Sequence, residues 1–228
     1  YYLMKWQLQL EGPVDNLSYN YVLKVRDREQ TPLILKFGMP GVDFTNEIRA
    51  TKVYKGASFA RLYQYDELDG VMLLERLEPG YMLSEVESEE QVIHHYIEIW
   101  KALRTPVKPS FPSMKSWFDE LQVYLEKYSK DDCLTPHTLV KNAQCYAQEL
   151  FETTAGEELL HGDLHHYNIL YDEERGWCAI DPKGVIGDPY FDFVAFLFNE
   201  LHMKEQPQSL LKWRIDTLCT VLQLDKSR

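Results

Sequence analysis

Hydrophobic and polar positions alternate with a period of two through much of the first third of the chain. In residues 32–37 the odd-numbered side chains are apolar and share one face of a strand, whereas Ile34 and Lys36 point to the other face. Similar short runs, bounded by turn residues, predict further strands. These strands are expected over residues 7–10, 21–25, 61–66 and 71–77, with a short helix over residues 46–54.

A helical period replaces this alternation after residue 77. The predicted helices lie over residues 92–103, 117–128, 139–151, 191–201 and 209–222. Residues 78–80, Glu-Pro-Gly, have the composition of a linker. The sequence therefore predicts an α+β fold of two lobes. Residues 1–77 are expected to form an antiparallel sheet with one helix, and residues 78–228 a larger helical lobe.

The composition is that of a folded protein, with 45% hydrophobic and 13% aromatic residues in a chain of 228. The formal charge of −12 argues against nucleic acid as a partner. That charge suits a small cationic substrate, and it is explained equally well by solubility. No apolar run reaches the roughly 20 residues that a membrane span requires.

The four cysteines form neither a Cys-x-x-Cys pair nor a zinc-binding spacing. We interpret them as reduced structural residues of a cytoplasmic protein, and the sequence shows no signal peptide. The chain starts at Tyr1 without a methionine and stops abruptly at Arg228, so we expect both ends of the protein to be incomplete.

Candidate chemistry is concentrated in Leu-His-Gly-Asp-Leu-His-His-Tyr-Asn-Ile-Leu-Tyr at residues 160–171 and Trp-Cys-Ala-Ile-Asp-Pro at residues 177–182. Asn168 follows Asp163 with the Asp-x-x-x-x-Asn spacing of a kinase catalytic loop. Asp181 ends the next apolar run, where such enzymes place a metal-binding aspartate.

These three residues match the needs of phosphoryl transfer to a hydroxyl. Asp163 is the predicted base that orients the acceptor O–H and takes its proton, although an isolated aspartate of this kind would more often cap a turn. Asn168 and Asp181 are predicted to hold Mg²⁺ against the phosphates of ATP, because Mg²⁺ prefers hard oxygen ligands.

The histidines of this segment raise the alternative of a metal cluster. Zinc-binding pairs lie at positions i and i+4 on a helix, but His161, His165 and His166 lie in a predicted loop, so we reject the cluster. We expect His161 to pack beneath the loop and to hydrogen-bond backbone groups near Asp181.

Lys36 lies in a strand whose other residues are strongly apolar, and a charge in such a place needs a partner. Glu47 in the following helix is the expected partner. Such a pair directs the ammonium at the phosphates of a nucleotide. The alternative is an exposed lysine on an edge strand.

Further nucleotide contacts are predicted around the sheet. The loop of residues 12–20 lies where phosphates would be covered, with backbone N–H groups and the side chain of Asn16 or Ser18 as donors. An ordinary hairpin loop is the alternative. The backbone from Glu75 to Leu77 is expected to hydrogen-bond adenine, and Leu74 and Leu77 to contact it; a plain strand end is the alternative.

A short segment after Asp181 has a structural interpretation. Asp188 is placed to cap the next helix, and Asp192 in its first turn is expected to accept hydrogen bonds from catalytic-loop amides. Lys183 suits either a contact with phosphate or a pair with Asp188, and the sequence leaves both open.

Taken together, these motifs resemble the aminoglycoside phosphotransferase family, which has a protein-kinase-like fold. His-Gly-Asp-x-His-x-x-Asn at residues 161–168 points to the superfamily. Ile-Asp-Pro-Lys-Gly at residues 180–184 points to the branch of streptomycin 6-phosphotransferases and hydroxyurea-resistance kinases.

The resemblance implies roles residue by residue. Asp163 matches the family's catalytic aspartate, Asn168 and Asp181 match its Mg²⁺ ligands, and Lys36 with Glu47 matches its phosphate-orienting pair. Two features depart from the family. Tyr167 stands where a glycine is usual, and the chain ends sooner after residue 192 than family members do.

The expected function is transfer of the γ-phosphoryl group of Mg·ATP to a hydroxyl of a small cationic molecule, such as the aminoglycoside streptomycin. A kinase of choline, a fructosamine-like amine or homoserine is the alternative within this class. A nucleotide-binding pseudokinase is the alternative outside it, and the presence of all the site residues argues against it. A protein kinase is disfavoured because no Ala-Pro-Glu segment or activation loop fits after Asp181. The sequence leaves ATP versus GTP and the oligomeric state open.

Overall fold

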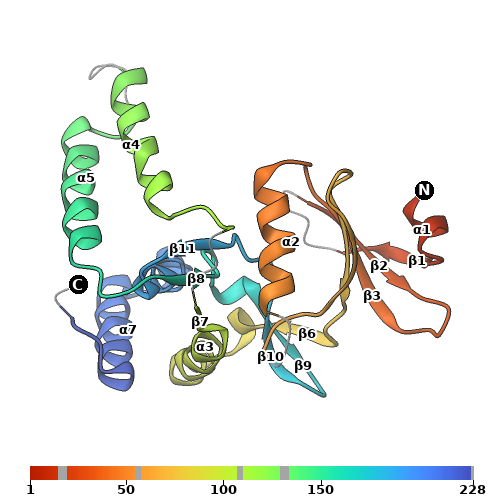
Figure 1. The fold of residues 1–228 in the computed structure, drawn as a ribbon. Helices are drawn as coiled ribbons and strands as arrows, with labels where there is room; N and C mark the ends of the chain where they lie inside the picture. The colour runs from red at the N-terminus through yellow and green to blue at the C-terminus, as the bar shows by residue number, and fades with distance from the viewer. Residues whose placement is uncertain (15–19, 55–57, 107–109, 129–133, 227–228) are drawn as a thin grey trace.

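The protein consists of an antiparallel five-stranded sheet with a helix against it, followed by a mainly helical part that contains two small sheets. A computed structural model describes residues 1–14, 20–54, 58–106, 110–128 and 134–226. In Figure 1 the large sheet lies on the right with α2 beside it, and α4, α5 and α7 lie on the left. The order of sheet first and helices afterwards is the predicted α+β arrangement.

The elements of the first part are α1 (Tyr2–Lys5), β1 (Gln9–Pro13), β2 (Tyr21–Arg26), β3 (Pro32–Phe37), α2 (Val42–Tyr54), β4 (Leu62–Asp66) and β5 (Val71–Glu75). Strands and short 3₁₀ helices of the second part are β6 (Pro79–Met82), η1 (Leu83–Glu85), β7 (Thr105–Pro106), β8 (Glu158–Leu160), η2 (His166–Asn168), β9 (Ile169–Asp172), β10 (Gly176–Ala179), β11 (Val185–Gly187), η3 (Pro189–Phe191) and η4 (Leu201–Met203). Its α-helices are α3 (Glu89–Leu103), α4 (Lys115–Lys127), α5 (His137–Glu152), α6 (Asp192–Phe198) and α7 (Pro207–Leu222).

The strands of the large sheet follow the order β1-β2-β3-β5-β4. Lys36 on β3 lies opposite Met72 on β5, and Ile34 lies opposite Leu74, so these side chains share one face. The same face packs against α2 through residues such as Ile48, which is fully buried. The helix therefore covers the face from which Lys36 projects.

The opposite face of the sheet is covered by the start of the chain. Val25 and Leu35 are fully buried there, and Tyr2 of α1 packs against them. The Tyr2 hydroxyl donates a hydrogen bond to Asp69 Oδ2 at 2.6 Å. The strand predicted over residues 32–37, with its two distinct faces, is confirmed. The helix α1 escaped prediction because one helical turn carries no periodic signal.

The two small sheets link the helical part to the large sheet. β9 lies between β6 and β10, and β8 lies between β7 and β11. The prediction that residues 78–80 form a linker is wrong, because β6 starts at Pro79 and pairs with β9. Glu-Pro-Gly has a turn-like composition, but here the backbone meets a partner strand that lies far along the chain.

The helix α3 lies at the centre of the helical part. Ser88 caps its N-terminus. Tyr96 is fully buried and stacks on Phe196 of α6 with 3.9 Å between ring centroids, and Trp100 contacts Phe193 at 4.8 Å. Burial of such a side chain stabilises the fold by roughly 2 kcal/mol. The neighbouring helix α6 is therefore held to α3 mainly by aromatic packing.

Most predicted boundaries shift by a few residues in the structure. The helix predicted over residues 46–54 starts at Val42, and the strand predicted over residues 71–77 ends at Glu75. The strand predicted over residues 7–10 starts at Gln9, and the helix predicted over residues 191–201 ends at Phe198. The early end of this helix has a backbone cause, because Asn199 is extended with a ψ of 133° and Glu200 follows with a φ of 64°.

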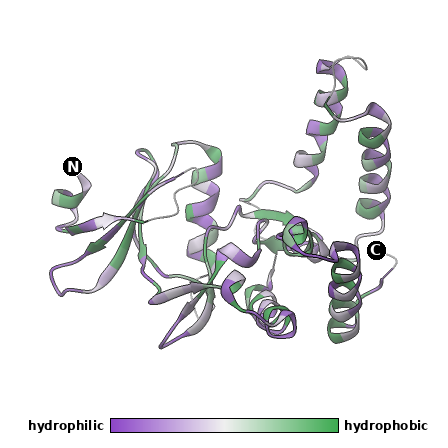
Figure 2. Ribbon diagram, turned by 180° about the vertical axis from the view of Figure 1, so that it is seen from behind, coloured by the Kyte–Doolittle hydropathy of each residue, from purple (hydrophilic) through white to green (hydrophobic). Residues whose placement is uncertain are grey.

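Hydrophobic residues are spread over all elements and are not collected in one long helix (Figure 2). The helices α5 and α7 each have 16 residues, and both carry charged side chains. Within the described ranges, no helix is long and apolar enough to cross a membrane.

Gly184 marks a point where the fold requires the absence of a side chain. Its φ is 65°, and a Cβ atom there would lie 2.9 Å from Ala50 Cβ and 3.0 Å from the Asn46 carbonyl oxygen of α2. We expect the added methyl group of Gly184→Ala to displace α2 from its position against residue 184. The free energy of unfolding, measured by urea denaturation, should fall by about 2–4 kcal/mol.

Gly176 provides the matched control for this substitution. Its φ is 72°, but nothing lies within 4 Å of a Cβ atom placed there. Gly176→Ala should therefore cost only the backbone strain, about 1 kcal/mol. Equal losses for the two variants would contradict the steric argument.

Candidate active site

The catalytic segment lies in a loop between β8 and β9, whose facing ends, Leu160 and Ile169, are buried. Gly162 in this loop has a φ of 79°, a conformation that favours glycine. The N–H of Lys183 donates to the His161 carbonyl at 2.7 Å. The segment that follows Asp181 therefore runs alongside the loop that carries Asp163.

His161 joins these two segments from below. Its Nε2 donates to the Ile180 carbonyl at 2.8 Å, and its Nδ1 accepts a hydrogen bond from the Asp163 N–H at 3.3 Å. This pair of bonds requires a neutral ring with its proton on Nε2. Complete burial lowers the pKa of His161 to about 4, which keeps the ring neutral. The expectation that His161 packs beneath the loop is confirmed.

Asp192 holds the same loop from the other side. Its carboxylate accepts hydrogen bonds from the N–H groups of His161 at 3.2 Å and Gly162 at 2.7 Å, as predicted. Burial raises the pKa of Asp192 to about 6, although these two bonds oppose the rise. The predicted cap is also present, since Asp188 accepts from the Tyr190 N–H at 3.0 Å.

Asp163 projects from this clamped loop with about a third of its side chain exposed. His165 Nε2 lies 3.5 Å from Asp163 Oδ1, and Lys183 Nζ lies 3.6 Å from Asp163 Oδ2. The Asn168 side chain donates Nδ2 to the Asp163 carbonyl at 2.9 Å. Asp163 and Asn168 are therefore neighbours, and the Asp163 carboxylate itself is open to an incoming molecule.

Lys36 on β3 connects the large sheet to the segment that carries Asp181. Its side chain is 3% exposed, and its Nζ lies 2.5 Å from Glu47 Oε1 and 2.9 Å from Asp181 Oδ1. The predicted Lys36–Glu47 pair is thus present, and the alternative of an exposed edge lysine is excluded. Burial alone would lower the pKa of Lys36, but the two carboxylates raise it to about 12.

Asp181 is held in an uncommon backbone conformation, with a φ of 59°. Burial disfavours its ionised form, but the ammonium of Lys36 outweighs this effect and holds the pKa of Asp181 below its usual range. The carboxylate is therefore negative at neutral pH, with Oδ1 on Lys36 and Oδ2 left for another ligand.

The side chains at this place fit a magnesium ion. The hydrogen bond from Asn168 Nδ2 to Asp163 turns the amide oxygen Oδ1 away from that bond. Asn168 Oδ1 and Asp181 Oδ2 are both hard oxygen atoms, and two such protein ligands beside phosphate oxygens and water are common for Mg²⁺. The nearby histidines are occupied in other ways: His161 bonds backbone groups, and His166 stacks on Phe196 at 4.7 Å.

Leu74 and Leu77, predicted to contact adenine, have different surroundings. Leu74 packs with Ile48 beneath α2 and belongs to the core of the sheet. Leu77 packs with Cys178 and with the partly buried Ile180, the residue before Asp181. The structure thus places Leu77, more than Leu74, at the junction between the two parts of the chain.

The backbone N–H of Glu75 is already used, since it donates to the Arg61 carbonyl at 2.8 Å. Its carboxylate forms ion pairs with Arg175 and, at 3.4 Å, with Arg61. Among the hydrogen bonds of the described residues, the Leu77 N–H has no acceptor, which leaves it for the predicted contact with adenine. Outside the described residues lie the two predicted side-chain donors, Asn16 and Ser18.

Two aromatic residues beside Asp163 were not assigned a role from the sequence. The Tyr167 hydroxyl donates to Glu200 Oε1 at 2.9 Å, and the φ of 64° at Glu200 marks a locally strained turn. Trp117 of α4 approaches Gly162, with its Cη2 atom 3.4 Å from the position of an added Cβ. The sequence offered one indication for Tyr167, because this residue stands where the family usually has glycine. No motif in the sequence around Trp117 indicated that this residue lies near the site.

Arg214 of α7 is a second unpredicted contributor. It is fully buried, donates Nη2 to Glu89 Oε2 at 2.9 Å and lies 3.3 Å from His166 Nε2. It also donates to the Phe196 carbonyl near the end of α6 at 3.1 Å. Burial, followed by the charge of Arg214, lowers the pKa of His166 to about 3. The catalytic loop is thereby tied to α3, α6 and α7.

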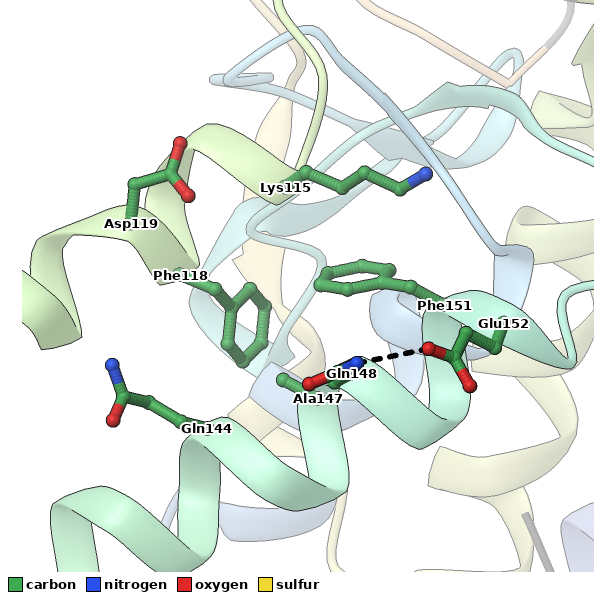
Figure 3. Close-up of a pocket in the computed structure, with 8 residues that line it drawn as sticks. All are labelled: Lys115, Phe118, Asp119, Gln144, Ala147, Gln148, Phe151 and Glu152. Carbon is green, nitrogen blue, oxygen red and sulfur yellow. Dashed lines mark hydrogen bonds between the residues drawn. The ribbon is translucent and has the colours of Figure 1, made fainter.

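A groove of about 540 Å³ lies between α4 and α5 (Figure 3). It is lined by Lys115, Phe118, Asp119, Gln144, Ala147, Gln148, Phe151 and Glu152. Phe118 and Phe151 are 5.2 Å apart, and both contact Phe191, which directly precedes Asp192. The groove contains none of the predicted site residues. Aromatic packing nevertheless connects its walls to Phe191, the residue before Asp192.

This architecture is that of a protein-kinase-like phosphotransferase fold. An aminoglycoside phosphotransferase solved as a ternary complex with ADP and hygromycin B matches with a TM-score of 0.68 and 14% identity, over 96% of this chain and 80% of that one. A choline/ethanolamine kinase family protein from Mesorhizobium loti matches with a TM-score of 0.68 and 18% identity, over 93% of this chain and 71% of that one. The predicted fold class is confirmed.

The chain belongs to the aminoglycoside/hydroxyurea antibiotic resistance kinase family, whose model matches residues 5–228. Streptomycin 6-kinase of Streptomyces griseus is 27% identical over 98% of this chain and 74% of its own length. Hydroxyurea phosphotransferase of Kitasatospora aureofaciens is 31% identical over 100% of this chain and 66% of its own length. The resemblance inferred from the motifs is therefore confirmed.

The neutral state of His161 predicts a pH effect. Its pKa falls from 6.5 in the unfolded chain to about 4 in the fold, so its contribution to stability is complete above pH 6.5 and is lost as the pH falls toward 4. The loss is on the order of 3 kcal/mol. Asp192 acts in the opposite direction, because its raised pKa favours the fold as the pH falls from about 6.

His161→Asn separates the two contributions, since an asparagine keeps an acceptor for the Asp163 N–H but does not titrate. We expect the variant to be less stable than the wild type at pH 7, and the difference to shrink on acidification to pH 4. Urea unfolding across this range measures it. A difference that stays constant with pH would show that His161 is not held neutral.

Proposed function

We propose that this protein transfers the γ-phosphoryl group of Mg·ATP to a hydroxyl of a small molecule, and that the acceptor is an aminoglycoside such as streptomycin. The observation that carries this proposal is the buried Lys36 between Glu47 and Asp181, with Asp163 and Asn168 on the adjoining loop. A lysine held in this way directs its charge at nucleotide phosphates in kinases. Membership of a kinase family supports the proposal.

The nucleotide is proposed to bind between the two parts of the chain. Residues 1–77 supply Lys36 and Glu47, and residues 78–228 supply Asp163, Asn168 and Asp181. Adenine would lie at the junction, beside Leu77 and its free N–H. The Leu77 side chain packs with Ile180, the residue before Asp181. The proposed adenine contact and the proposed metal ligand therefore lie close together.

Asp163 is the proposed base because it is the carboxylate that remains available. Asp181 is paired with Lys36, and Asp192 is buried by the loop amides. As the acceptor oxygen bonds to the γ-phosphorus, its proton passes to Asp163, and the bond to the β–γ bridging oxygen breaks with its electron pair leaving on ADP. The hydrogen bonds that His161 and Asp192 make to the loop keep Asp163 in place for this step.

Asn168 and Asp181 would hold Mg²⁺ through Oδ1 and Oδ2. When bound, the ion neutralises charge on the phosphate oxygens. Lys36 supplies the second positive charge to the nucleotide, and Glu47 keeps its ammonium in place. The remaining protein groups orient and shield the reactants.

The proposed acceptor site lies on the open side of Asp163, near Tyr167, Glu200 and Trp117. A cationic acceptor is favoured by the net charge of −12. Several relatives are streptomycin kinases, which favours streptomycin over other cationic alcohols. A test panel should contain streptomycin, hydroxyurea and choline.

Purified protein with Mg·ATP should release ADP in the presence of streptomycin, and Asp163→Asn should lower kcat by about 10³-fold with a KM for ATP near that of the wild type. Asp216→Asn, which alters an exposed ion pair on α7, is the control and should keep full activity. Coupled ADP detection measures both. Equal turnover by wild type and Asp163→Asn would remove Asp163 from its role.

Magnesium binding is tested separately from turnover. The affinity for ADP should rise about tenfold with Mg²⁺ relative to EDTA in the wild type, and this gain should vanish in Asn168→Ala. Asn168→Asp keeps a hard oxygen ligand but loses the donor to the Asp163 carbonyl, so it should keep the gain. Calorimetry measures the six affinities, with Mg²⁺ and with EDTA for each of the three proteins, and a full Mg²⁺ effect in Asn168→Ala would contradict the assignment.

A further inference from the structure

The motif Ile-Asp-Pro-Lys-Gly leaves one residue without a role in the proposed reaction. Lys183 is fixed at its backbone, because its N–H donates to the His161 carbonyl at 2.7 Å and its Cβ lies 3.1 Å from the position of an added Cβ at Gly162. Its side chain is 54% exposed, and its Nζ lies 3.6 Å from Asp163 Oδ2. The backbone is thus rigid, and the ammonium is free to move near the proposed base.

The charges of the site distinguish Lys183 from Lys36. Lys36 is buried and bonded to Glu47 and Asp181, so its charge is largely matched within the protein. Lys183 has a single long contact with Asp163 in the described part of the chain. Lys183 Nζ lies beside Asp163, so its ammonium is in position to answer new negative charge next to that carboxylate.

New negative charge develops at that place during transfer. The acceptor hydroxyl must lie against Asp163, and the γ-phosphorus must lie in line behind its oxygen. The transferring phosphoryl group therefore passes within a few ångströms of Asp163, which is the reach of a lysine whose Nζ already lies 3.6 Å from that carboxylate. A cation there stabilises the transition state more than the ground state.

On this basis we propose that Lys183 is a catalytic residue whose ammonium leaves Asp163 and binds the transferring phosphoryl group. The inference rests on the proposed phosphotransferase function. Lys183 stays protonated throughout, while the proton of the acceptor hydroxyl passes to Asp163 and the leaving electron pair stays on ADP. Departure of the ammonium also frees the Asp163 carboxylate to accept the hydrogen bond of the acceptor.

A purely structural ion pair is the competing explanation, and it makes a different prediction. Exposed pairs of this kind contribute little to stability. Lys101 offers a matched control, because it is 48% exposed and lies 3.5 Å from Glu98 on the surface of α3, far from the site in sequence. Lys183→Met and Lys101→Met should therefore both unfold at the temperature of the wild type.

Binding of a transition-state mimic separates the two explanations without turnover. Mg·ADP affinity is measured with and without aluminium fluoride, which occupies the position of the transferring phosphoryl group. Wild type and Lys101→Met should bind at least tenfold more tightly with aluminium fluoride. Lys183→Met should bind Mg·ADP within twofold of the wild type but lose this gain, and Lys183→Arg should recover part of it.

Turnover with streptomycin provides the second readout. Lys183→Met should lower kcat about 100-fold with little change in the KM for ATP. A full aluminium fluoride gain in Lys183→Met would overturn the inference, and so would an equal loss of affinity for Mg·ADP alone, which would indicate ground-state binding. If the wild type binds no Mg·ADP, the proposed function fails and this inference fails with it.

Discussion

The structure depends on one buried cation, the ammonium of Lys36. A charge that is 3% exposed is costly unless ionic partners surround it, and here the partners are Glu47 and Asp181. The lysine comes from β3, the glutamate from α2 and the aspartate from the segment after β10. One electrostatic requirement therefore fixes the sheet, its helix and the segment that carries Asp181 relative to one another.

A second set of contacts fixes the catalytic loop through neutral and backbone groups. His161 donates to the carbonyl of Ile180, just before Asp181, and accepts a hydrogen bond from the Asp163 N–H in the loop. Asp192 accepts hydrogen bonds from the consecutive N–H groups of His161 and Gly162. Because these bonds lie in buried surroundings, losing one leaves an unpaired polar group, which costs about 1–3 kcal/mol. The loop is therefore held more firmly than its irregular backbone suggests.

The proposed acceptor side of the site is built differently from the proposed nucleotide side. Lys36 and Glu47 are buried and paired, whereas Lys183 and Tyr167 are substantially exposed and lie around an open Asp163. Buried pairs keep a fixed geometry, and exposed charges on long side chains adjust to a ligand. This contrast matches the different demands of a constant nucleotide and a moving acceptor group.

The sequence by itself determined what local order and spacing can determine. The alternation in residues 32–37 defined the strand and the side from which Lys36 projects, and the spacing of Asp163, Asn168 and Asp181 defined the catalytic motif. The role of His161 beneath the loop also followed, because a histidine next to Gly-Asp in an apolar surrounding has few other uses.

Only the tertiary structure decided the partners that meet across long stretches of chain. It placed Pro79 and Gly80 of the predicted linker in a strand beside β9, bonded the Glu75 N–H to the Arg61 carbonyl, and brought Lys183 close to Asp163. Periodicity and spacing report which face a residue occupies, but hydrogen-bond and ion-pair partners are chosen by how distant elements pack. Where no motif marks the partners, the order of the residues carries no signal for them, unlike the Lys36–Glu47 pair, which the sequence predicted.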